Sequence, residues 1–311
     1  MDERNDLKGK TIVVTGATSG IGRAVVQALA LGGAHVIGVG RSPDRCCFVQ
    51  EAVSAASPGA RLSFAIADLA SQGQVRSLNS EIRRMVEEAG ADYIDVLINN
   101  AGTVSSWRKV TEDGYELQFA VNHLAPFLLT LGLLPLLQAA PSGRVVTVSS
   151  GSHYKARMNW RDLMYRRHYS CLRAYKQSKL ANVLFTVELN RRLGKQSPVR
   201  AYAADPGLVD TGIGQKGTSG LEKLVWKLRR RRGASPEEGA KTIVYLATQD
   251  LAENADRVYW KACRPKQPSA SALQAEDASR LWTISERLCG LGDDAESAVK
   301  RGQLQSIGVY A

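Results

Sequence analysis

"TIVVTGATSGIG", residues 11–22, joins a short apolar run to a glycine-rich turn. The run at 11–16 is rich in β-branched residues and has no polar alternation, which is typical of a strand buried on both faces. Residues 20–33 then carry apolar side chains at helical spacing and end in a glycine pair suited to a helix C-terminus. A buried strand, a tight turn and a helix in direct succession indicate a layered α/β fold.

The same alternation continues along the chain. Helices are expected between successive strands, and parallel strands joined by right-handed crossovers place those helices on both faces of one sheet. We therefore predict a single α/β domain with a doubly wound, Rossmann-type parallel sheet of about seven strands. The further strands are expected at 34–40, 62–69, 94–102, 143–150, 199–207 and 257–261, and the helices at 71–89, 112–138, 172–193 and 233–248.

The predicted domain covers residues 8–262 and includes two substrate loops, at about 151–173 and 208–233. Residues 263–311 form a C-terminal extension, in which "ASRLWTISERL" has the apolar spacing of one amphipathic helix and the rest reads as a flexible tail. The helix at 233–248 begins with a capping box, Ser235 and Glu238.

Composition narrows the class of protein. Of 311 residues, 44% are apolar and 23% charged, which is ordinary for a soluble globular protein. We found no apolar run near the ~18–20 residues that span a bilayer, and the polar N-terminus lacks the apolar core of a signal peptide. These features predict a cytoplasmic protein.

Charge, cysteine and histidine patterns argue against several alternatives. The net charge of +11 comes without a nucleic-acid-binding motif, so no nucleic acid partner is expected. The five cysteines form no CxxC pair, which favours free thiols. None of the four histidines has metal-ligand spacing, so we expect no metal site.

The glycine-rich turn is suited to a dinucleotide. Gly16 allows the tight turn, while Gly20 and Gly22 let backbone amides approach a pyrophosphate at the helix N-terminus. At the end of the second strand, the acidic residue that would hold the ribose hydroxyls is missing. Gly40 is expected to leave space there, and Arg41 matches a 2′-phosphate. This predicts NADP(H) rather than NAD(H), although nearby Asp44 keeps the alternative open.

Polar residues also end the third and fourth strands. Asp68 either contacts the adenine or caps the following helix. "NNAG", residues 99–102, carries two amide side chains that can satisfy backbone groups around a cofactor and brace neighbouring strands.

The second half of the chain contains a group of residues suited to proton transfer. Tyr175 and Lys179 lie one helical turn apart, on one face. A free phenol has a pKa of ~10, which is too high for efficient acid–base work near neutrality, and a nearby ammonium lowers that value. Ser149 and Ser150 end the fifth strand, where a hydroxyl can donate to a substrate oxygen. Beside a nicotinamide, these groups suit hydride transfer to or from a carbonyl.

"TGATSGIG", "NNAG", "VNHLAPF", "VSS" and "YKQSK" occur in the order and at the spacing of the short-chain dehydrogenase/reductase family, which the sequence resembles over residues ~8–260. The resemblance implies that Tyr175 is the general acid/base, that Lys179 lowers its pKa and holds the ribose, and that Ser150 binds the reacting oxygen. It also implies that Asn122 supports a water-linked proton relay to Lys179. The cofactor-binding residues expected are Gly16, Ser19, Gly20, Ile21, Gly22, Arg41, Asp68, Leu69, Asn99, Ala101, Gly102, Tyr175, Lys179, Pro206, Gly207 and Thr211.

Three features resemble one branch, that of the retinol dehydrogenases and WW-domain oxidoreductases. They are the long gap between Ser150 and Tyr175, the sequence "SKLAN" and the C-terminal "RLWTISERL". The resemblance implies an NADP(H)-dependent oxidoreductase for a largely apolar retinoid-, steroid- or lipid-like alcohol or carbonyl. The alternative is an NADP(H)-binding sensor or scaffold without turnover, which has no chemical need for the intact proton-transfer set. Ala125, Pro126 and Asp205 depart from the branch and leave the substrate open.

Residues 221–232 combine an apolar helical face with a cluster of Lys and Arg, including "KLRRRR" at 227–232. Such a helix can lie in a membrane interface. The competing interpretation is a lid packed on the protein, with a solvated basic edge. Whether the chain forms a homo-oligomer is left open by its sequence.

Overall fold

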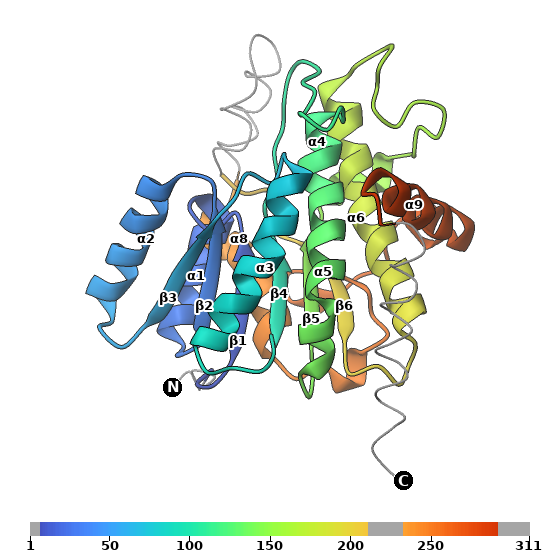
Figure 1. Ribbon diagram of the computed structural model, residues 1–311. Coiled ribbons are helices and arrows are strands. Elements are labelled where there is room, and N and C mark those ends of the chain that lie inside the picture. The colour runs from blue at the N-terminus through green and yellow to red at the C-terminus, as the bar shows by residue number, and fades with distance from the viewer. Residues whose placement is uncertain (1–6, 211–232, 292–311) are drawn as a thin grey trace.

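One eight-stranded sheet forms the centre of the molecule (Figure 1), in a computed structural model that describes residues 7–210 and 233–291. The strand order is β3-β2-β1-β4-β5-β6-β7-β8, and all neighbours are parallel except the antiparallel pair β7 and β8. The doubly wound fold is thus confirmed, with one short strand more than expected. The strands are β1 (Thr11–Thr15), β2 (His35–Gly40), β3 (Arg61–Ile66), β4 (Val96–Asn99), β5 (Arg144–Val148), β6 (Arg200–Asp205), β7 (Tyr259–Lys261) and β8 (Arg264–Pro265).

Helices cover both faces of the sheet. Side chains alternate along each buried strand, so Val13 of β1 belongs to one core, with α3, α5, α6 and α9, while Ile12 and Val14 belong to the other, with α1, α2 and α8. The helices are α1 (Gly20–Leu31), α2 (Pro43–Ala56), α3 (Gln72–Glu88), α4 (Leu117–Phe119), α5 (Ala125–Ala139), α6 (Cys171–Leu193), α8 (Pro236–Thr248) and α9 (Ala275–Leu288).

Helix α2 is absent from the sequence prediction. It begins after Ser42 with Pro43 in its first turn and buries Cys46, Val49 and Val53 on one face. That narrow stripe lies in an otherwise polar segment, which gives a weak helical pattern. Its place matters because α2 begins directly beside the predicted ribose site.

The helix predicted at 112–138 consists of three pieces. Short α4 leads into a π-helical turn, Ala120–Leu124, and α5 follows. A π-helical turn accommodates an extra residue within a helix and is frequent at functional sites. Asn122 lies in this turn, as does buried His123.

The apolar stretch at Leu117–Ala139 corrects one expectation from the sequence. These 23 residues have a mean hydropathy of 1.7 and are long and apolar enough to cross a membrane. Within the fold, however, 78% of the apolar window is buried, and α5 packs against α3 over the sheet (Figure 1). The stretch therefore serves as a core helix in this structure, whose apolar character is explained by its burial.

The segment after β8 is firmly packed as far as residue 291. Helix α9 lies against α6, and its Trp282 is 2% exposed. The indole packs edge-on to Phe127 at 5.0 Å between ring centroids, and the guanidinium of Arg192 lies 4.5 Å from its ring. The expected tail, together with Thr211 and residues 221–232, lies outside the described residues.

Candidate active site

A cavity of about 720 Å³ opens at the carboxyl ends of the central strands. Ligands bind at this edge in doubly wound sheets. Asn99 and Asn122 lie outside the lining that the described residues form. The structure brings together the other predicted site residues that it describes, namely Gly16, Ser19, Gly20, Ile21, Gly22, Arg41, Asp68, Leu69, Ala101, Gly102, Ser150, Tyr175, Lys179, Pro206 and Gly207.

The turn between β1 and α1 is shaped for close approach of a ligand. Gly16 and Gly20 have φ angles of +67° and +53°, in the left-handed region that favours glycine. A Cβ at Gly22 would lie 2.1 Å from Gly16 O and 2.4 Å from Asn100 Nδ2, so no larger residue fits without a shift. Because the α1 N-terminus faces the cavity with free amide donors, the turn suits a phosphate.

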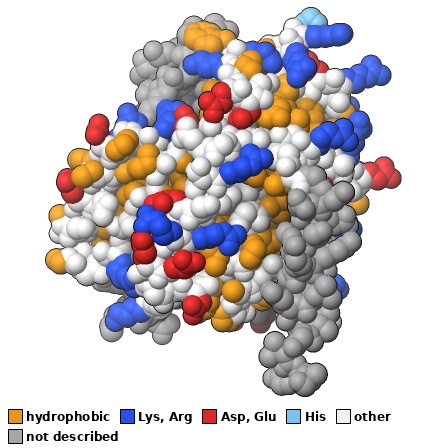
Figure 2. Space-filling view, in the orientation of Figure 1, with side chains coloured by type: hydrophobic (Ala, Val, Ile, Leu, Met, Phe, Trp, Pro, Cys, Tyr) orange, Lys and Arg blue, Asp and Glu red, His pale blue; other side chains and the backbone are white. Residues whose placement is uncertain are grey.

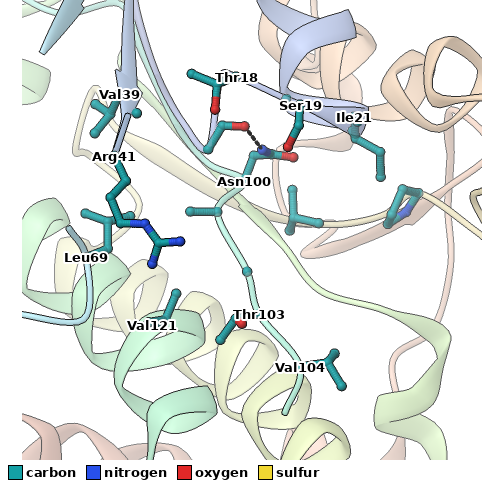
Figure 3. A pocket seen from close by; sticks show the side chains of 18 of the residues that line it. Thr18, Ser19, Ile21, Val39, Arg41, Leu69, Asn100, Thr103, Val104 and Val121 are labelled. Atoms are coloured by element: carbon teal, nitrogen blue, oxygen red, sulfur yellow. Dashed lines mark hydrogen bonds between the residues drawn. The ribbon is translucent and has the colours of Figure 1, made fainter. Parts of the chain in front are cut away.

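Asn100 braces this turn, as Figure 3 shows beside Thr18 and Ser19. Its Nδ2 donates to Thr15 O at 2.8 Å, and its backbone N–H donates to Thr15 Oγ1 at 3.0 Å. Asn99, the predicted cofactor contact, instead donates from Nδ2 to Thr130 Oγ1 at 2.9 Å and is 2% exposed. The structure thus places Asn100 in the cavity wall and Asn99 behind it.

Two arginines lie at the adenosine end. Arg41 points into the cavity near Leu69 (Figure 3), and its Nη1 lies 3.5 Å from Asp68 Oδ2. Arg45 also lines the cavity and was missed, because it lies in the first turn of the unpredicted α2. Asp44, which kept NAD(H) open in the sequence, lies outside the described lining.

Asp68 does not cap the next helix. That cap is Ser71, whose Oγ accepts from Gln74 N. Asp68 Oδ1 accepts from Ala70 N at 3.0 Å, and the residue lines the cavity beside Arg41. The sequence left two positions open for Asp68, at the cavity or at the helix N-terminus. The structure places it at the cavity.

The space expected at Gly40 is filled. A Cβ there would lie 2.4 Å from Cys46 Sγ and 2.6 Å from Thr18 Cγ2. Our expectation of room beside the ribose was therefore wrong, since the cysteine side chain of α2 occupies it. Gly40→Asp would disrupt packing rather than test cofactor choice, so such a test has to use the two arginines.

Tyr175 and Lys179 project from α6 toward the end of β5. Lys179 is 3% exposed, and its Nζ donates to Val148 O at 3.0 Å. The same Nζ lies 5.7 Å from the centroid of the Tyr175 ring. Burial lowers the pKa of the Lys179 ammonium to about 8, while the negative charge of Asp205 acts in the opposite direction.

The two serines after β5 have different partners. Ser149 is 1% exposed, and its Oγ donates to Lys179 O at 2.8 Å. Ser150 caps the 3-10 turn Gly151–Lys155, and its Oγ accepts from Ser152 N at 3.2 Å. Because Ser150 Oγ is the acceptor in that contact, its O–H remains a donor for a ligand in the cavity.

Asn122 is buried beside the cavity wall. Its Oδ1 accepts from Thr103 N at 2.7 Å, and its Nδ2 donates to Ser178 Oγ at 2.9 Å and to Thr103 O at 3.1 Å. These bonds tie the π-helical turn to the loop after β4 and to α6. Asn122 thereby fixes two walls of the site, and its part in a proton relay stays a prediction.

Neither metal ligands nor a disulfide contribute to this site. Across residues 7–210 and 233–291, no three His, Cys, Asp or Glu side chains form a group that could hold a metal ion. None of the five cysteines, all within the described residues, forms a disulfide, and Cys46, Cys171 and Cys289 are buried.

Comparison with known proteins agrees with this geometry. The pattern of the short chain dehydrogenase family matches residues 10–221. Retinol dehydrogenase 13 of Mus musculus is 36% identical over 294 residues, 92% of this chain and 85% of its own length. The crystal structure of an uncharacterized protein from Mycobacterium paratuberculosis is 35% identical, with a TM-score of 0.71 over 92% of this chain and 95% of its own.

A second solved structure has a bound cofactor. It is the angucycline C-6 ketoreductase LanV with bound NADP, 26% identical, with a TM-score of 0.65 over 83% of this chain and 95% of its own. The motifs, the fold and these relatives agree on the resemblance to the retinol dehydrogenase branch and on chemistry at alcohol and carbonyl groups. This chain belongs to the short chain dehydrogenase family and is an oxidoreductase acting on alcohol or carbonyl groups.

Proposed function

We propose that the protein is an NADP(H)-dependent oxidoreductase that acts on the alcohol or carbonyl carbon of a largely apolar small molecule. The observation that carries the proposal is that one cavity is lined both by the glycine-rich turn suited to a phosphate and by Ser150, Tyr175 and Lys179. The nicotinamide would accept or supply the hydride. A sensor or scaffold could use the turn alone, and it would have no use for an ammonium buried beside a phenol.

Side chains of the protein bind the substrate oxygen and transfer the proton. Ser150 donates a hydrogen bond to the substrate oxygen and holds it near Tyr175. Tyr175 gives that oxygen a proton during reduction and takes it back during oxidation. Lys179, held on Val148 O, favours the phenolate by its positive charge and binds the ribose. We assign to Asn122 the support of a water-linked proton path to Lys179.

The choice of NADP(H) rests on Arg41 and Arg45, which line the adenosine end together. Both guanidiniums suit a 2′-phosphate in charge and geometry. The NADP bound by LanV supports the same choice. We expect NADPH to bind at least about tenfold more tightly than NADH.

Replacing Arg41 with Ala should weaken NADPH binding and leave NADH binding almost unchanged. A charge-assisted hydrogen bond contributes ~1.5–3 kcal/mol, which corresponds to roughly 10–150-fold in affinity. Arg45→Ala should act in the same direction, and the double variant should bind both cofactors alike. Fluorescence titration of wild type and the three variants with each cofactor measures these affinities, with Arg84→Ala on the exposed face of α3 as the control. Equal weakening of both cofactors by Arg41→Ala would refute the assignment.

The cavity lining includes apolar side chains that suit an apolar ligand. Among them are Val104, Leu117, Val121, Leu208 and Val209. The name of its relative, retinol dehydrogenase, points to the same class, and we propose retinoid-, steroid- or lipid-like substrates. The test is a screen of NADPH oxidation with retinoid, steroid, aliphatic and quinone carbonyls. Tight NADPH binding without turnover of any of them would favour the sensor instead.

We further propose a cytoplasmic protein that makes peripheral contact with an anionic membrane. The segment first considered, 221–232, lies outside the described residues. Within them, the segment 155–173, which joins the 3-10 turn to the first turn of α6, exposes six cations, and Trp107 and Val110 are 53% and 50% exposed next to Lys109 of the cavity lining. Lys and Arg side chains gather at the upper right of Figure 2, where this segment lies in Figure 1. The six are Lys155, Arg157, Arg161, Arg166, Arg167 and Arg173.

Sedimentation with vesicles containing anionic lipid should capture the protein at low salt and release it at high salt. Replacing Arg161, Arg166 and Arg167 with Ser should weaken capture by at least ~10-fold, because each basic residue contributes ~1 kcal/mol near such a surface. A control variant removes three exposed cations elsewhere, Arg84, Lys195 and Lys241. An equal loss of vesicle binding in both triple variants would show that only the net charge of the protein determines this binding.

A further inference from the structure

Asp205 is a buried carboxylate that the proposed chemistry does not use. It is the last residue of β6 and is 2% exposed. Its Oδ1 accepts from Gly207 N at 3.0 Å, and its Oδ2 accepts from the Tyr259 hydroxyl at 2.8 Å. Lys261 Nζ lies 3.7 Å from Oδ2. A charge so buried is tolerated only with partners of this kind.

The sheet places this carboxylate beside the catalytic lysine. Val148 pairs with Ala204 in the β5–β6 register, and Ser149 N donates to Ala204 O at 2.8 Å. Lys179 Nζ is held on Val148 O, so its anchor and Asp205 lie one residue apart in register on strands separated by ~4.8 Å. In addition, a Cβ at Gly151 would lie 3.2 Å from Asp205 Oδ2, which puts the carboxylate against the turn after Ser150.

We propose that Asp205 is a positioning residue that acts through Lys179, as the buried counter-charge that keeps this side chain an ammonium at neutral pH. The inference rests on the proposed role of Lys179 in proton transfer. Burial by itself lowers the pKa of Lys179, and the charge of Asp205 raises it. Without that carboxylate the lysine would lose its proton at lower pH, and the positive charge that favours the Tyr175 phenolate would be lost with it.

Among the described residues around this pair, Asp205 carries the negative charge near Lys179. The other groups there are cationic or neutral. Lys261 is an opposing cation that pairs with Asp205, and its 44% exposed side chain is only partly screened by solvent. The Tyr259 hydroxyl donates to Asp205, and the Tyr154 hydroxyl donates to Gln267 O. Both phenols are neutral, since burial raises the pKa of each. Lys266, the cation near Tyr154, lies 4.8 Å from that ring.

His153 adds no charge to the pair. Its Nε2 accepts from Ser269 N at 3.1 Å, so the proton is on Nδ1, which donates to Ser150 O at 2.8 Å. Burial lowers the pKa of this imidazole, which keeps it neutral at physiological pH. The histidine holds the Ser150 backbone in place and leaves Asp205 to act on Lys179.

The decisive experiment measures the titration of Lys179 directly, by NMR of protein labelled with ¹³C at the lysine ε-carbon. The Lys179 signal is assigned by its loss in Lys179→Arg. Asp205→Asn retains the shape and removes the charge, and we expect the Lys179 midpoint to fall by about one pH unit. The alkaline limb of the rate profile for carbonyl reduction should move by the same amount. Because the NMR titration needs no substrate, it is independent of the proposed activity.

Three variants separate the charge from packing. Tyr259→Phe removes one hydrogen bond and keeps the carboxylate, so the titration midpoint of Lys179 in this variant should stay much closer to wild type. Asp95→Asn removes a carboxylate of similar burial at the opposite end of the sheet, paired with Lys10 at 2.8 Å, and should leave Lys179 unchanged. Lys261→Met alters an exposed side chain and should raise the midpoint slightly.

An unchanged midpoint in Asp205→Asn, or an equal fall in Asp95→Asn, would overturn the proposal. If Asp205→Asn fails to fold, Lys261→Met decides the matter, since a midpoint that stays or falls in that variant contradicts a counter-charge. A shifted midpoint without any turnover would support Asp205 while refuting the enzymatic role.

Discussion

Tyr175→Phe should lower turnover by about 10²–10⁴-fold while NADPH binding remains close to wild type. In the proposed mechanism the phenol supplies or takes the proton, and loss of a positioned general acid typically has an effect of this size. The ring itself should still pack beside Lys179, which lies 5.7 Å from its centroid. Steady-state rates with the best carbonyl substrate, together with NADPH titration, measure both quantities.

Tyr115→Phe is the matched control for this substitution. The Tyr115 hydroxyl donates to Leu288 O at 2.8 Å, and the residue lies outside the described cavity lining. Its loss should reduce stability slightly and leave the rate nearly unchanged. A Tyr175→Phe protein with a kcat near that of Tyr115→Phe would remove Tyr175 from the mechanism.

Ser150→Ala should reduce kcat by about 10²–10³-fold, the range typical of removing one hydrogen-bond donor to a reacting oxygen. The hydroxyl lines the cavity at the end of β5 and remains a donor for the substrate. Cofactor affinity should change little, because Ser150 is not part of the phosphate-binding turn. Single-turnover rates with saturating NADPH isolate the chemical step.

The neighbouring serine gives an internal control. Ser149 Oγ donates to Lys179 O in the α6 backbone, so Ser149→Ala should lower the free energy of unfolding by about 0.5–1.5 kcal/mol. Its effect on the chemical step should be far smaller than that of Ser150→Ala. If the two variants lose rate equally, the assignment of Ser150 over Ser149 is wrong.

Much of the fold could be predicted from local patterns. The buried strand at 11–15, the glycine turn after it and the capping box of Ser235 and Glu238 all lie where the sequence put them. Each depends on residues close together in the chain, where apolar period, capping and turn chemistry act directly. Helix α2 was missed because its apolar stripe is narrow, and the π-helical turn at Ala120–Leu124 because the apolar pattern runs through it without a break.

The identity of the chemistry was also readable, since Tyr175 and Lys179 stand one helical turn apart and their spacing alone puts them on one face. The sequence did not predict in the same way which of two adjacent residues enters the site. Neighbouring residues of an extended strand point in opposite directions. Whether Asn99 or Asn100 reaches the turn therefore depends on the register and on partners elsewhere in the chain.

The sequence by itself determined the doubly wound sheet, and its short-range spacing also predicts the phosphate-binding turn and the proton-transfer set. Only the tertiary structure decided that Cys46 fills the space beside Gly40, that Arg45 joins Arg41, and that Asp205 lies beside the anchor of Lys179. These contacts join residues from separate elements, and they arise from how helices and strands pack. The electrostatic environment of the catalytic lysine is thus a property of strand order and burial, which no local pattern contains.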